Sequence, residues 1–222
     1  MSYEGLKPVT FFSCLTEENL DLIQAHCKEL SFPKDSVVLH QEEQSFDLYI
    51  IVEGSVRISL VNSDGREVDL AILGKGDFFG ELSFLDNRSR SAMVTAATPV
   101  KIMSLQKDAF RKIVRENSDI AINLLSVMAS RLRKSNEMIE TLTFLDVAGR
   151  IAKMLIRLAK ESGEKMPDGF LKVSCPTHQT IANQIGASRE SVTKAMKSFI
   201  SNGLIAVVGK DIIISPKQFE IL

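Results

Sequence analysis

The chain has 222 residues, of which 45% are hydrophobic, and its 27 Lys and Arg against 28 Asp and Glu give a formal net charge of −1. This composition is close to the globular average, which excludes disordered and fibrous proteins, and the length allows one large domain or two small ones. No run approaches the ~18 apolar residues of a membrane span, and Met1–Thr10 lacks the features of a signal peptide, so we expect a cytoplasmic protein with no membrane partner.

The cysteines predict neither a disulfide framework nor a metal site. Cys14, Cys27 and Cys175 are odd in number and widely spaced. Zinc and iron–sulfur sites need ligands at closer spacing, so we expect reduced thiols and no bound metal.

The first half of the chain predicts a small antiparallel barrel or roll. Phe12–Leu30 has a helical pattern, in which Thr16 and Glu17 suit a helix start. Short runs rich in Val, Ile, Leu and Thr follow, separated by Gly-containing turns. The expected strands are Ser36–His40, Asp47–Val52, Ser55–Val61, Glu67–Leu73 and Ala92–Thr98.

Asp119–Leu145 contains no Gly or Pro, which predicts one helix ~40 Å long. Its apolar positions repeat at alternating spacings of three and four, the pattern of a parallel coiled-coil seam, although a helix packed on its own domain is the alternative. The seam positions are Leu125, Met128, Leu132, Ser135, Ile139 and Leu142. Ser135 is the polar member, and Arg131 and Asn136 lie beside it, so polar groups gather at one level of the stripe.

A second domain is expected from Val147 onward. Val147–Ser162 is an amphipathic helix with Ile151, Leu155 and Leu158 on one face. A loop over 162–169 follows. Three strands are then expected at Phe170–Cys175, Ile205–Val208 and Asp211–Ile214.

Residues His178–Phe199 predict a helix-turn-helix. Thr177 and Ser188 are suitable N-caps, and Gly186 suits the left-handed turn between the helices. Ile181, Ala182, Ile185, Val192 and Ala195 would form the buried face. The second helix would expose Arg189, Glu190, Ser191, Thr193, Lys194 and Lys197, and such side chains contact base edges and phosphates. A solvated charged face on an ordinary helix pair is the alternative.

The charge is divided unevenly along the chain. Residues 147–222 carry a net +5 and residues 1–146 a net −6. A basic half beside an acidic half favours nucleic-acid contact through the basic half, although the total is near zero.

A second group of polar residues lies at Gly80-Glu81-Leu82 and Arg90-Ser91-Ala92. A carboxylate can accept from a ribose hydroxyl, and an Arg can neutralise a phosphate. From the residues alone, an Arg near a Glu is more often a surface ion pair, so the spacing by itself does not establish a binding site.

These segments together resemble the CRP/FNR superfamily, most closely its catabolite-activator branch. Gly80–Ala92 resembles the family's phosphate-binding cassette, Phe144–Ala152 its hinge, and Gly186–Val192 its recognition helix. The likeness runs from Phe11 to Pro216. It implies an α+β protein with an N-terminal antiparallel β-roll, a long dimerisation helix and a C-terminal winged helix-turn-helix, divided at 1–118, 119–146 and 147–222.

The resemblance implies a homodimer that binds cyclic AMP, then promoter DNA, and recruits RNA polymerase. Glu81 would hold the ribose 2′-hydroxyl, and Arg90 and Ser91 the cyclic phosphate. The remaining expected ligand contacts are Gly80, Leu82, Arg131, Ser135 and Asn136. The expected DNA contacts are Thr177, His178, Gln179, Ser188, Arg189, Glu190, Ser191, Lys194 and Lys197.

Four positions depart from the activator pattern. Ser135 and Asn136 replace Thr and Ser, and because Asn both donates and accepts, cyclic GMP and cyclic di-GMP remain open as effectors. Lys194 replaces an Arg and cannot form the same bidentate contact. His178 replaces an Arg, which weakens a phosphate contact near neutral pH.

Other functions stay open at this point. A constitutive DNA binder with an unused pocket fits the motifs, as does a regulatory nucleotide-binding module for an enzyme. We expect no enzymatic activity of the chain itself, because it has no P-loop, kinase motif or nucleophile–base pair. An oxygen sensor would need a cluster of N-terminal cysteines. A haem sensor would need axial ligands, for which His26 and His40 fall in no recognisable pattern.

Overall fold

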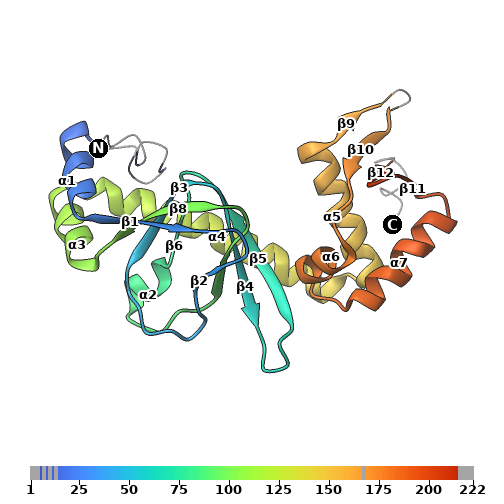
Figure 1. Ribbon diagram of the computed structural model, residues 1–222, viewed down its shortest axis with the longest axis horizontal. Coiled ribbons are helices and arrows are strands. Elements are labelled where there is room, and N and C mark those ends of the chain that lie inside the picture. The colour runs from blue at the N-terminus through green and yellow to red at the C-terminus, as the bar shows by residue number, and fades with distance from the viewer. Residues whose placement is uncertain (1–5, 7–8, 10–11, 13–14, 167–168, 215–222) are drawn as a thin grey trace. The chain divides into compact units, whose positions relative to one another are not determined.

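The computed structural model describes residues 6, 9, 12, 15–166 and 169–214 (Figure 1). The chain divides into two compact units, Met1–Ser135 and Asn136–Leu222. The expectations about Cys14 and about most of Met1–Thr10 lie outside the described residues.

Two antiparallel four-stranded sheets make up the roll of the first unit. The strands of one sheet are, in spatial order, β1 (Cys27–Phe32), β8 (Val100–Leu105), β3 (Leu48–Glu53) and β6 (Phe78–Phe79). Those of the other are β2 (Val37–Leu39), β7 (Met93–Ala96), β4 (Val56–Val61) and β5 (Glu67–Leu73). Apolar side chains from both sheets, such as Ile51, Val56 and Ile102, share one buried cluster. The predicted roll is confirmed.

One sequence prediction is wrong at the start of the roll. Helix α1 spans only Glu17–Ala25, and strand β1 (Cys27–Phe32) takes up the end of the predicted helix, from Cys27 to Leu30. Leu20, Ile23, Cys27 and Leu30 continue a helical spacing across the boundary, so the pattern conceals the change. The six-residue pairing of β1 with β8 decides the conformation. The strands β6 and β8 and the helix α2 (Glu81–Asp86) are additional elements that the sequence patterns did not predict.

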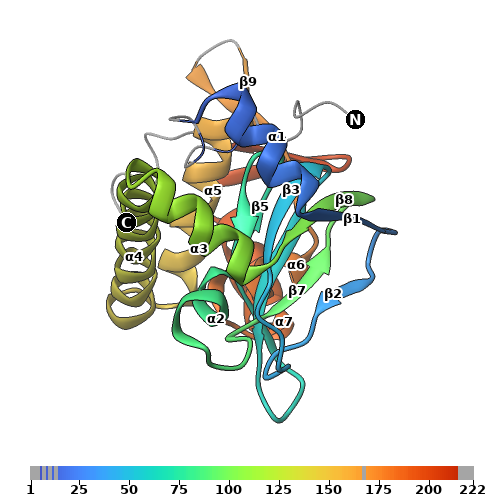
Figure 2. The ribbon, with the colours of Figure 1, turned by 90° about the vertical axis from the view of Figure 1, so that its left-hand side faces the viewer.

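Helices α3 (Lys107–Glu116) and α4 (Asp119–Phe144) follow the last strand of the roll (Figure 2). The long helix is confirmed to within one residue. Ile120 and Leu124, near its start, are buried with Phe110 in a second core cluster, which attaches α4 to the roll. Among the described residues, no helix combines the length and apolar character of a membrane span.

The second unit places three helices against a four-stranded antiparallel sheet. The helices are α5 (Val147–Ser162), α6 (His178–Ile185) and α7 (Arg189–Ser201). The sheet contains β11 (Ile205–Val208), β12 (Asp211–Ile214), β10 (Leu171–Ser174) and β9 (Glu164–Lys165). Ile151, Leu155, Ile181, Val192 and Ile212 belong to one buried core. The α+β class, with a helix-turn-helix and a small sheet beside it, is therefore confirmed.

Candidate functional site

The segment Gly80–Ser91 begins with a glycine that the backbone requires. Gly80 has φ 81° and caps helix α2 in the left-handed region, which favours glycine. A Cβ placed there would lie 2.6 Å from Nη1 of Arg90 and 3.0 Å from the Asp47 carbonyl oxygen. The close approach holds Glu81 at the first position of α2 and brings Arg90 against the same turn.

Arg90 is a buried cation with an exposed fraction of only 3%. Its Nε donates to Ser45 Oγ at 2.8 Å, Nη1 to the Gly80 carbonyl at 2.9 Å and Nη2 to the Asp47 carbonyl at 2.9 Å. The guanidinium also lies over the Tyr49 ring, 5.3 Å from its centroid. Burial lowers the pKa of Arg90 below its usual range, while the negative groups nearby act in the opposite direction. The positive charge of this cassette residue is thus held in place by three acceptors, one of them from the cassette itself.

Glu81 is joined to the long helix by an ion pair. Nη1 of Arg131 on α4 lies 2.9 Å from Glu81 Oε1, and the Glu81 side chain is mostly buried. Nη2 of Arg131 donates to the Phe78 carbonyl at 2.5 Å, and the guanidinium lies over the Phe78 ring at 4.5 Å. Glu81 and Arg131, which the sequence placed among the ligand contacts, are therefore in direct contact across 50 residues of chain.

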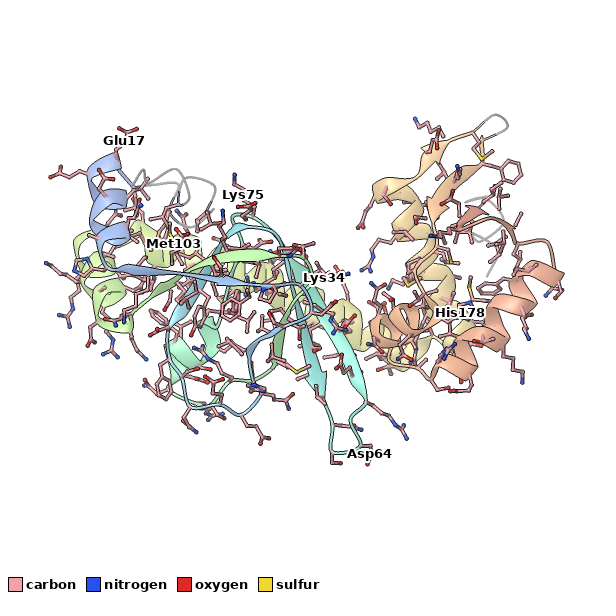
Figure 3. All side chains as sticks on the ribbon, in the orientation of Figure 1. Glu17, Lys34, Asp64, Lys75, Met103 and His178 are labelled. Carbon is pink, nitrogen blue, oxygen red and sulfur yellow. The ribbon has the colours of Figure 1, made fainter. Side chains whose placement is uncertain are left out.

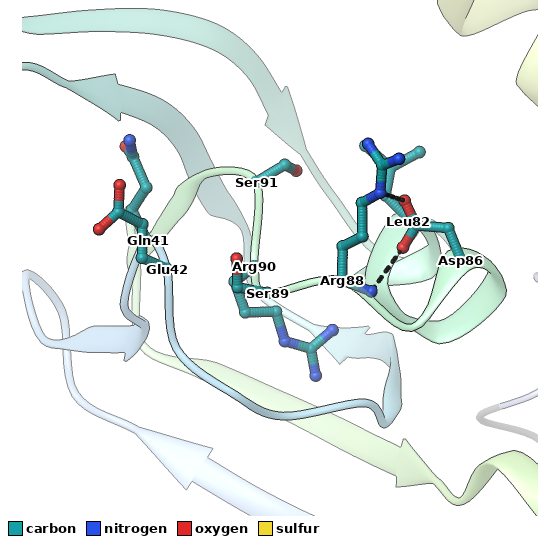
Figure 4. A pocket seen from close by; sticks show the side chains of 8 residues that line it. All are labelled: Gln41, Glu42, Leu82, Asp86, Arg88, Ser89, Arg90 and Ser91. Atoms are coloured by element: carbon teal, nitrogen blue, oxygen red, sulfur yellow. Dashed lines mark hydrogen bonds and ion pairs between the residues drawn. The ribbon is translucent and has the colours of Figure 1, made fainter.

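A pocket of 360 Å³ lies on the cassette (Figure 4). Leu82, Arg90 and Ser91, predicted from the sequence, line it together with five other residues. These are Gln41, Glu42, Asp86, Arg88 and Ser89. The backbone N–H of Glu42 donates to the Arg90 carbonyl at 2.8 Å, which attaches the loop before β3 to the cassette.

Ser135 is not among the residues that line this pocket. Its hydroxyl donates to the Arg131 carbonyl at 3.1 Å, and both it and Asn136 are exposed. Gly80, Glu81 and Arg131 are likewise absent from the lining of this pocket, so the structure pairs Glu81 with Arg131, places Leu82, Arg90 and Ser91 on the pocket, and leaves Ser135 and Asn136 on the helix surface.

Sequence reasoning missed the residues that hold Arg90. Ser45, Asp47 and Tyr49 lie more than 40 positions earlier, and Ser104 Oγ in turn donates to Asp47 Oδ2 at 2.6 Å. Nothing in the local pattern of Ser45–Tyr49 marks it as a partner of the cassette, because the contact arises only when β3 pairs with β6.

The helix-turn-helix has the predicted caps. Thr177 Oγ1 accepts from the Thr180 N–H at 3.1 Å, and Ser188 Oγ accepts from the Ser191 N–H at 3.1 Å. Gly186 has φ 64° and ends α6 in the left-handed region. Ile181, Ala182, Ile185 and Val192 are buried, and Ala195 is partly buried against them. These features fix α7 as a rigid second helix.

The exposed side of α7 carries most of the predicted contacts. Arg189, Glu190, Ser191, Lys194 and Lys197 are exposed. The pKa of Glu190 is lowered, first by a hydrogen bond from its own backbone N–H and second by the Ser188 hydroxyl, so its carboxylate is ionised at neutral pH. Three cations and one carboxylate therefore face outward from the first turns of α7.

The start of α6 presents three further predicted contacts. Thr177 and Gln179 are exposed, and Gln179 Nε2 donates to Asn183 Oδ1 at 2.8 Å. His178 is partly buried, and its Nδ1 lies 2.9 Å from Thr193 Oγ1 on α7.

One guanidinium joins the end of α4 to the helix-turn-helix within the second unit. Arg150 donates from Nε to the Leu145 carbonyl at 3.0 Å, from Nη2 to the Leu142 carbonyl at 2.9 Å, and from Nη1 to the Ile185 carbonyl at 3.2 Å. Helix C-termini leave carbonyls without intrahelical partners, so a cation there satisfies several at once.

The seam on α4 is an exposed apolar stripe. Leu125, Leu132 and Ile139 are 67%, 64% and 61% exposed, whereas Met128 packs on the core. Large apolar side chains gathered on one helix face are a common mark of an interaction surface.

No group of three or more His, Cys, Asp or Glu side chains in the described part of the chain could hold a metal ion. The pKa of Cys27 is raised by burial to about 11, and that of Cys175 is also raised by burial. Both are free thiols.

Comparison with known proteins identifies the family. A family model described as a cyclic nucleotide-binding domain matches residues 29–117, and one described as a Crp-like helix-turn-helix domain matches residues 149–219. The chain is 38% identical over 202 residues to the cAMP-activated global transcriptional regulator CRP of Salmonella typhimurium, covering 90% of this chain and 95% of that protein. The chain belongs to the CRP/FNR family. It is thus a transcription regulator with a cyclic nucleotide-binding domain, and not an enzyme.

Other CRP/FNR relatives cover the chain to a similar extent. The CRP-like cAMP-activated global transcriptional regulator of Mycobacterium tuberculosis is 40% identical over 217 residues, which are 97% of this chain and 92% of that protein. The Thermus thermophilus catabolite activator protein is similar in structure, with a TM-score of 0.56 and 25% identity over 95% of this chain and 96% of that one. The c-di-GMP responsive regulator CLP of Xanthomonas campestris has a TM-score of 0.78 at 23% identity, covering 90% and 99% of the two chains, which shows a shared fold.

Proposed function

We propose that this CRP/FNR protein is a cyclic-AMP-gated homodimer that acts in the cytoplasm, binds promoter DNA and recruits RNA polymerase. Two relatives at 38% and 40% identity over nearly the whole chain are named as cAMP-activated regulators. The working parts would be the roll at 1–118, the dimerisation helix and hinge at 119–146, and the winged helix-turn-helix at 147–222.

The cassette supplies the chemistry for a cyclic nucleotide. Glu81 accepts from the ribose 2′-hydroxyl, Arg90 and Ser91 neutralise and bond the cyclic phosphate, and backbone groups of Gly80 and Leu82 complete the cradle. Arg90 suits this role because it is buried and already oriented, so little conformational entropy is lost on binding.

The long helix carries the response. Because Arg131 pairs with Glu81, a ribose hydroxyl that bonds the same carboxylate changes the balance of contacts on α4. Ser135, and Asn136 from the second subunit, would contact the base. A ligand that takes such a dimer from mostly inactive to mostly active must prefer the active arrangement by roughly 10⁴-fold.

The exposed stripe on α4 fits a second copy of the chain. Its repeat of alternating three and four residues is that of a parallel two-stranded coiled coil, in which Leu125, Leu132 and Ile139 would be covered. Pairing brings two helix-turn-helix motifs together for a two-fold symmetric DNA site.

On DNA, the start of α7 would enter the major groove. Arg189 can contact guanine through two hydrogen bonds, and Glu190 can accept from the cytosine amino group. The other predicted DNA contacts would bind phosphates and neighbouring bases. These residues are Thr177, His178, Gln179, Ser188, Ser191, Lys194 and Lys197.

The observation that carries the proposal is the Glu81–Arg131 pair, because it connects the nucleotide cassette physically to the helix that would form the dimer. Calorimetric titration of the full chain with cyclic AMP, cyclic GMP and cyclic di-GMP tests it. We expect cyclic AMP to bind most tightly and to raise the affinity for a selected DNA duplex. Tighter binding of either alternative would reassign the effector, and DNA binding indifferent to all three would indicate a constitutive regulator.

Matched variants test the role of Arg90. Arg90→Ala should abolish the response to the nucleotide, whereas Arg88→Ala, which removes an exposed arginine at the rim of the same pocket, should weaken binding by much less. Equal losses for the two variants would contradict the assignment of the phosphate to Arg90.

A further inference from the structure

A histidine at the start of α6 is bonded to the second helix of the helix-turn-helix. His178 Nδ1 lies 2.9 Å from Thr193 Oγ1 (His178 is labelled in Figure 3). The pair links the first turn of α6 to the second turn of α7, and both side chains are partly buried.

The second bond of Thr193 determines which hydrogen the histidine carries. The Thr193 hydroxyl donates to the Arg189 carbonyl at 2.9 Å, a bond that threonines within helices often form with the residue four positions before. A carbonyl oxygen only accepts, and a hydroxyl has one hydrogen to donate. Thr193 Oγ1 must therefore accept from His178, which places a hydrogen on Nδ1 of the imidazole.

This assignment leaves Nε2 as the nitrogen whose character depends on pH. In the neutral ring with hydrogen on Nδ1, Nε2 has only a lone pair and can only accept. In the imidazolium, Nε2–H is a charged donor. No other protein group in the described residues forms a hydrogen bond or an ion pair with His178.

Helix α6 has no charged residue besides His178, and the two helices packed on it, α5 and α7, carry several. On α7 these are Arg189, Glu190, Lys194 and Lys197, and on α5 they are Arg150, Lys153, Arg157, Lys160 and Glu161. Cations predominate. Hydrogen bonds from its own N–H and from Ser188 lower the pKa of Glu190, and no ion pair joins Glu190 to His178 among the described residues.

We propose that His178 takes up a proton on Nε2 when this protein binds specific DNA, so that the affinity for DNA rises as the pH falls. This inference rests on the proposed function, in which His178 contacts a DNA phosphate. In the neutral ring, the lone pair of Nε2 would face a phosphate oxygen, and the two acceptors would repel each other. A proton taken from solvent converts Nε2 into a donor that forms a charge-assisted bond with the phosphate, and the proton returns to solvent when the DNA leaves.

The sign of the effect follows from linkage. The protonated form binds better, so affinity is greatest at acidic pH and is lost as the pH rises and His178 loses its proton. The maximum slope is about one log unit in the dissociation constant per pH unit for each proton taken up.

The experiment uses the full chain with saturating cyclic AMP and a duplex enriched from a random library at pH 6.5. Fluorescence anisotropy at constant ionic strength should show the dissociation constant rising between pH 6 and pH 7.5, by at most about tenfold per pH unit for each of the two His178 residues of a homodimer that takes up a proton. Calorimetry in phosphate and in Tris should show proton uptake on binding, as a difference in observed enthalpy between the two buffers.

Three variants and a control separate the causes. His178→Gln should bind with a flat pH profile, and His178→Arg should bind tightly at every pH. Thr193→Val, which removes the acceptor for Nδ1–H, should reduce the slope because the neutral ring can then carry its hydrogen on Nε2. His40→Gln, which changes a histidine of the other unit, should keep the full slope.

The outcomes distinguish this inference from the proposed function. Selective, cyclic-AMP-dependent binding with no pH slope, or a slope that survives in His178→Gln, would overturn the role of His178 alone. An unchanged slope in Thr193→Val would overturn the assignment of the tautomer. Failure to enrich any duplex at any pH would overturn the proposed function itself.

Discussion

Gly80→Ala should damage the cassette in a way that the structure allows to be measured. Gly80 has φ 81°, and a Cβ there would lie 2.6 Å from Arg90 Nη1. The left-handed backbone costs an alanine about 1–2 kcal/mol. Arg90 cannot simply move aside, because it is buried and bonded to Ser45, Asp47 and Gly80 itself. Losing a hydrogen bond to a charged group costs about 1.5–3 kcal/mol, so we expect a total destabilisation of about 3–5 kcal/mol.

Gly65→Ala provides the matched control. Gly65 has φ 73°, but a Cβ there meets nothing within 4 Å, so this variant bears the backbone strain without the collision. We expect it to lose about 1–2 kcal/mol and to bind cyclic AMP normally. The excess loss in Gly80→Ala therefore isolates the displacement of Arg90.

Urea titrations of the full chain, followed by circular dichroism because the protein has no Trp, measure both losses. Calorimetry should show cyclic AMP binding about 10–100-fold more weakly to Gly80→Ala, in line with the loss of a charge-assisted bond. If the two variants lost the same stability and both bound the nucleotide normally, the claim that Arg90 is held in a preformed position would be wrong.

Three further predictions follow from single side chains. Arg150→Ala leaves three carbonyls without their donor and should lower the free energy of unfolding in urea by roughly 2–4 kcal/mol. The control Arg157→Ala removes an exposed arginine of the same helix and should change it little. Equal losses in the two variants would refute the role of Arg150 in joining α4 to α6. Ser188→Ala should cost about 1 kcal/mol through loss of the α7 N-cap, and an unchanged unfolding midpoint would count against the cap. Burial raises the pKa of Cys27 to about 11 from an ordinary 9.0, so its alkylation at pH 7 should be about 100-fold slower than that of a free thiol, and the rate should rise with pH. The rate is measured in a variant whose other cysteines are replaced by serine. A normal rate would show that burial does not suppress the thiolate.

Much of the fold could be predicted because its elements carry local patterns. Strand β5 and helix α5 have the predicted bounds, since Gly turns and caps such as Asp146, which accepts from the Gly149 N–H at 2.8 Å, mark their ends. Strand β1 was mispredicted because its apolar residues continue the period of α1 and only pairing with β8 makes it extended. Strand β8 has five of six residues buried and so lacks the alternation of polar and apolar residues that marks a half-exposed strand.

The functional site was predictable only in part for a similar reason. Glu81, Arg90 and Ser91 lie within a short segment whose spacing resembles a known cassette. Ser45 and Asp47, which position Arg90, are distant in sequence. Ser45 accepts through its hydroxyl, and Asp47 accepts through its backbone carbonyl, which any residue type supplies. The contact of Arg131 with Glu81 likewise depends on where α4 packs, which the heptad spacing alone does not define.

The Glu81–Arg131 pair also has a thermodynamic consequence that runs in both directions. Suppose that the nucleotide alters the position of α4 through this pair and so changes the affinity for a partner subunit or for DNA by some factor. Because coupling free energies are reciprocal, the bound partner or DNA must then change the affinity for the nucleotide by the same factor. The concentration of effector that half-saturates the protein is thus not a constant of its pocket. It shifts with the number of DNA sites occupied, so a promoter that binds the protein tightly would itself lower the effector concentration needed there.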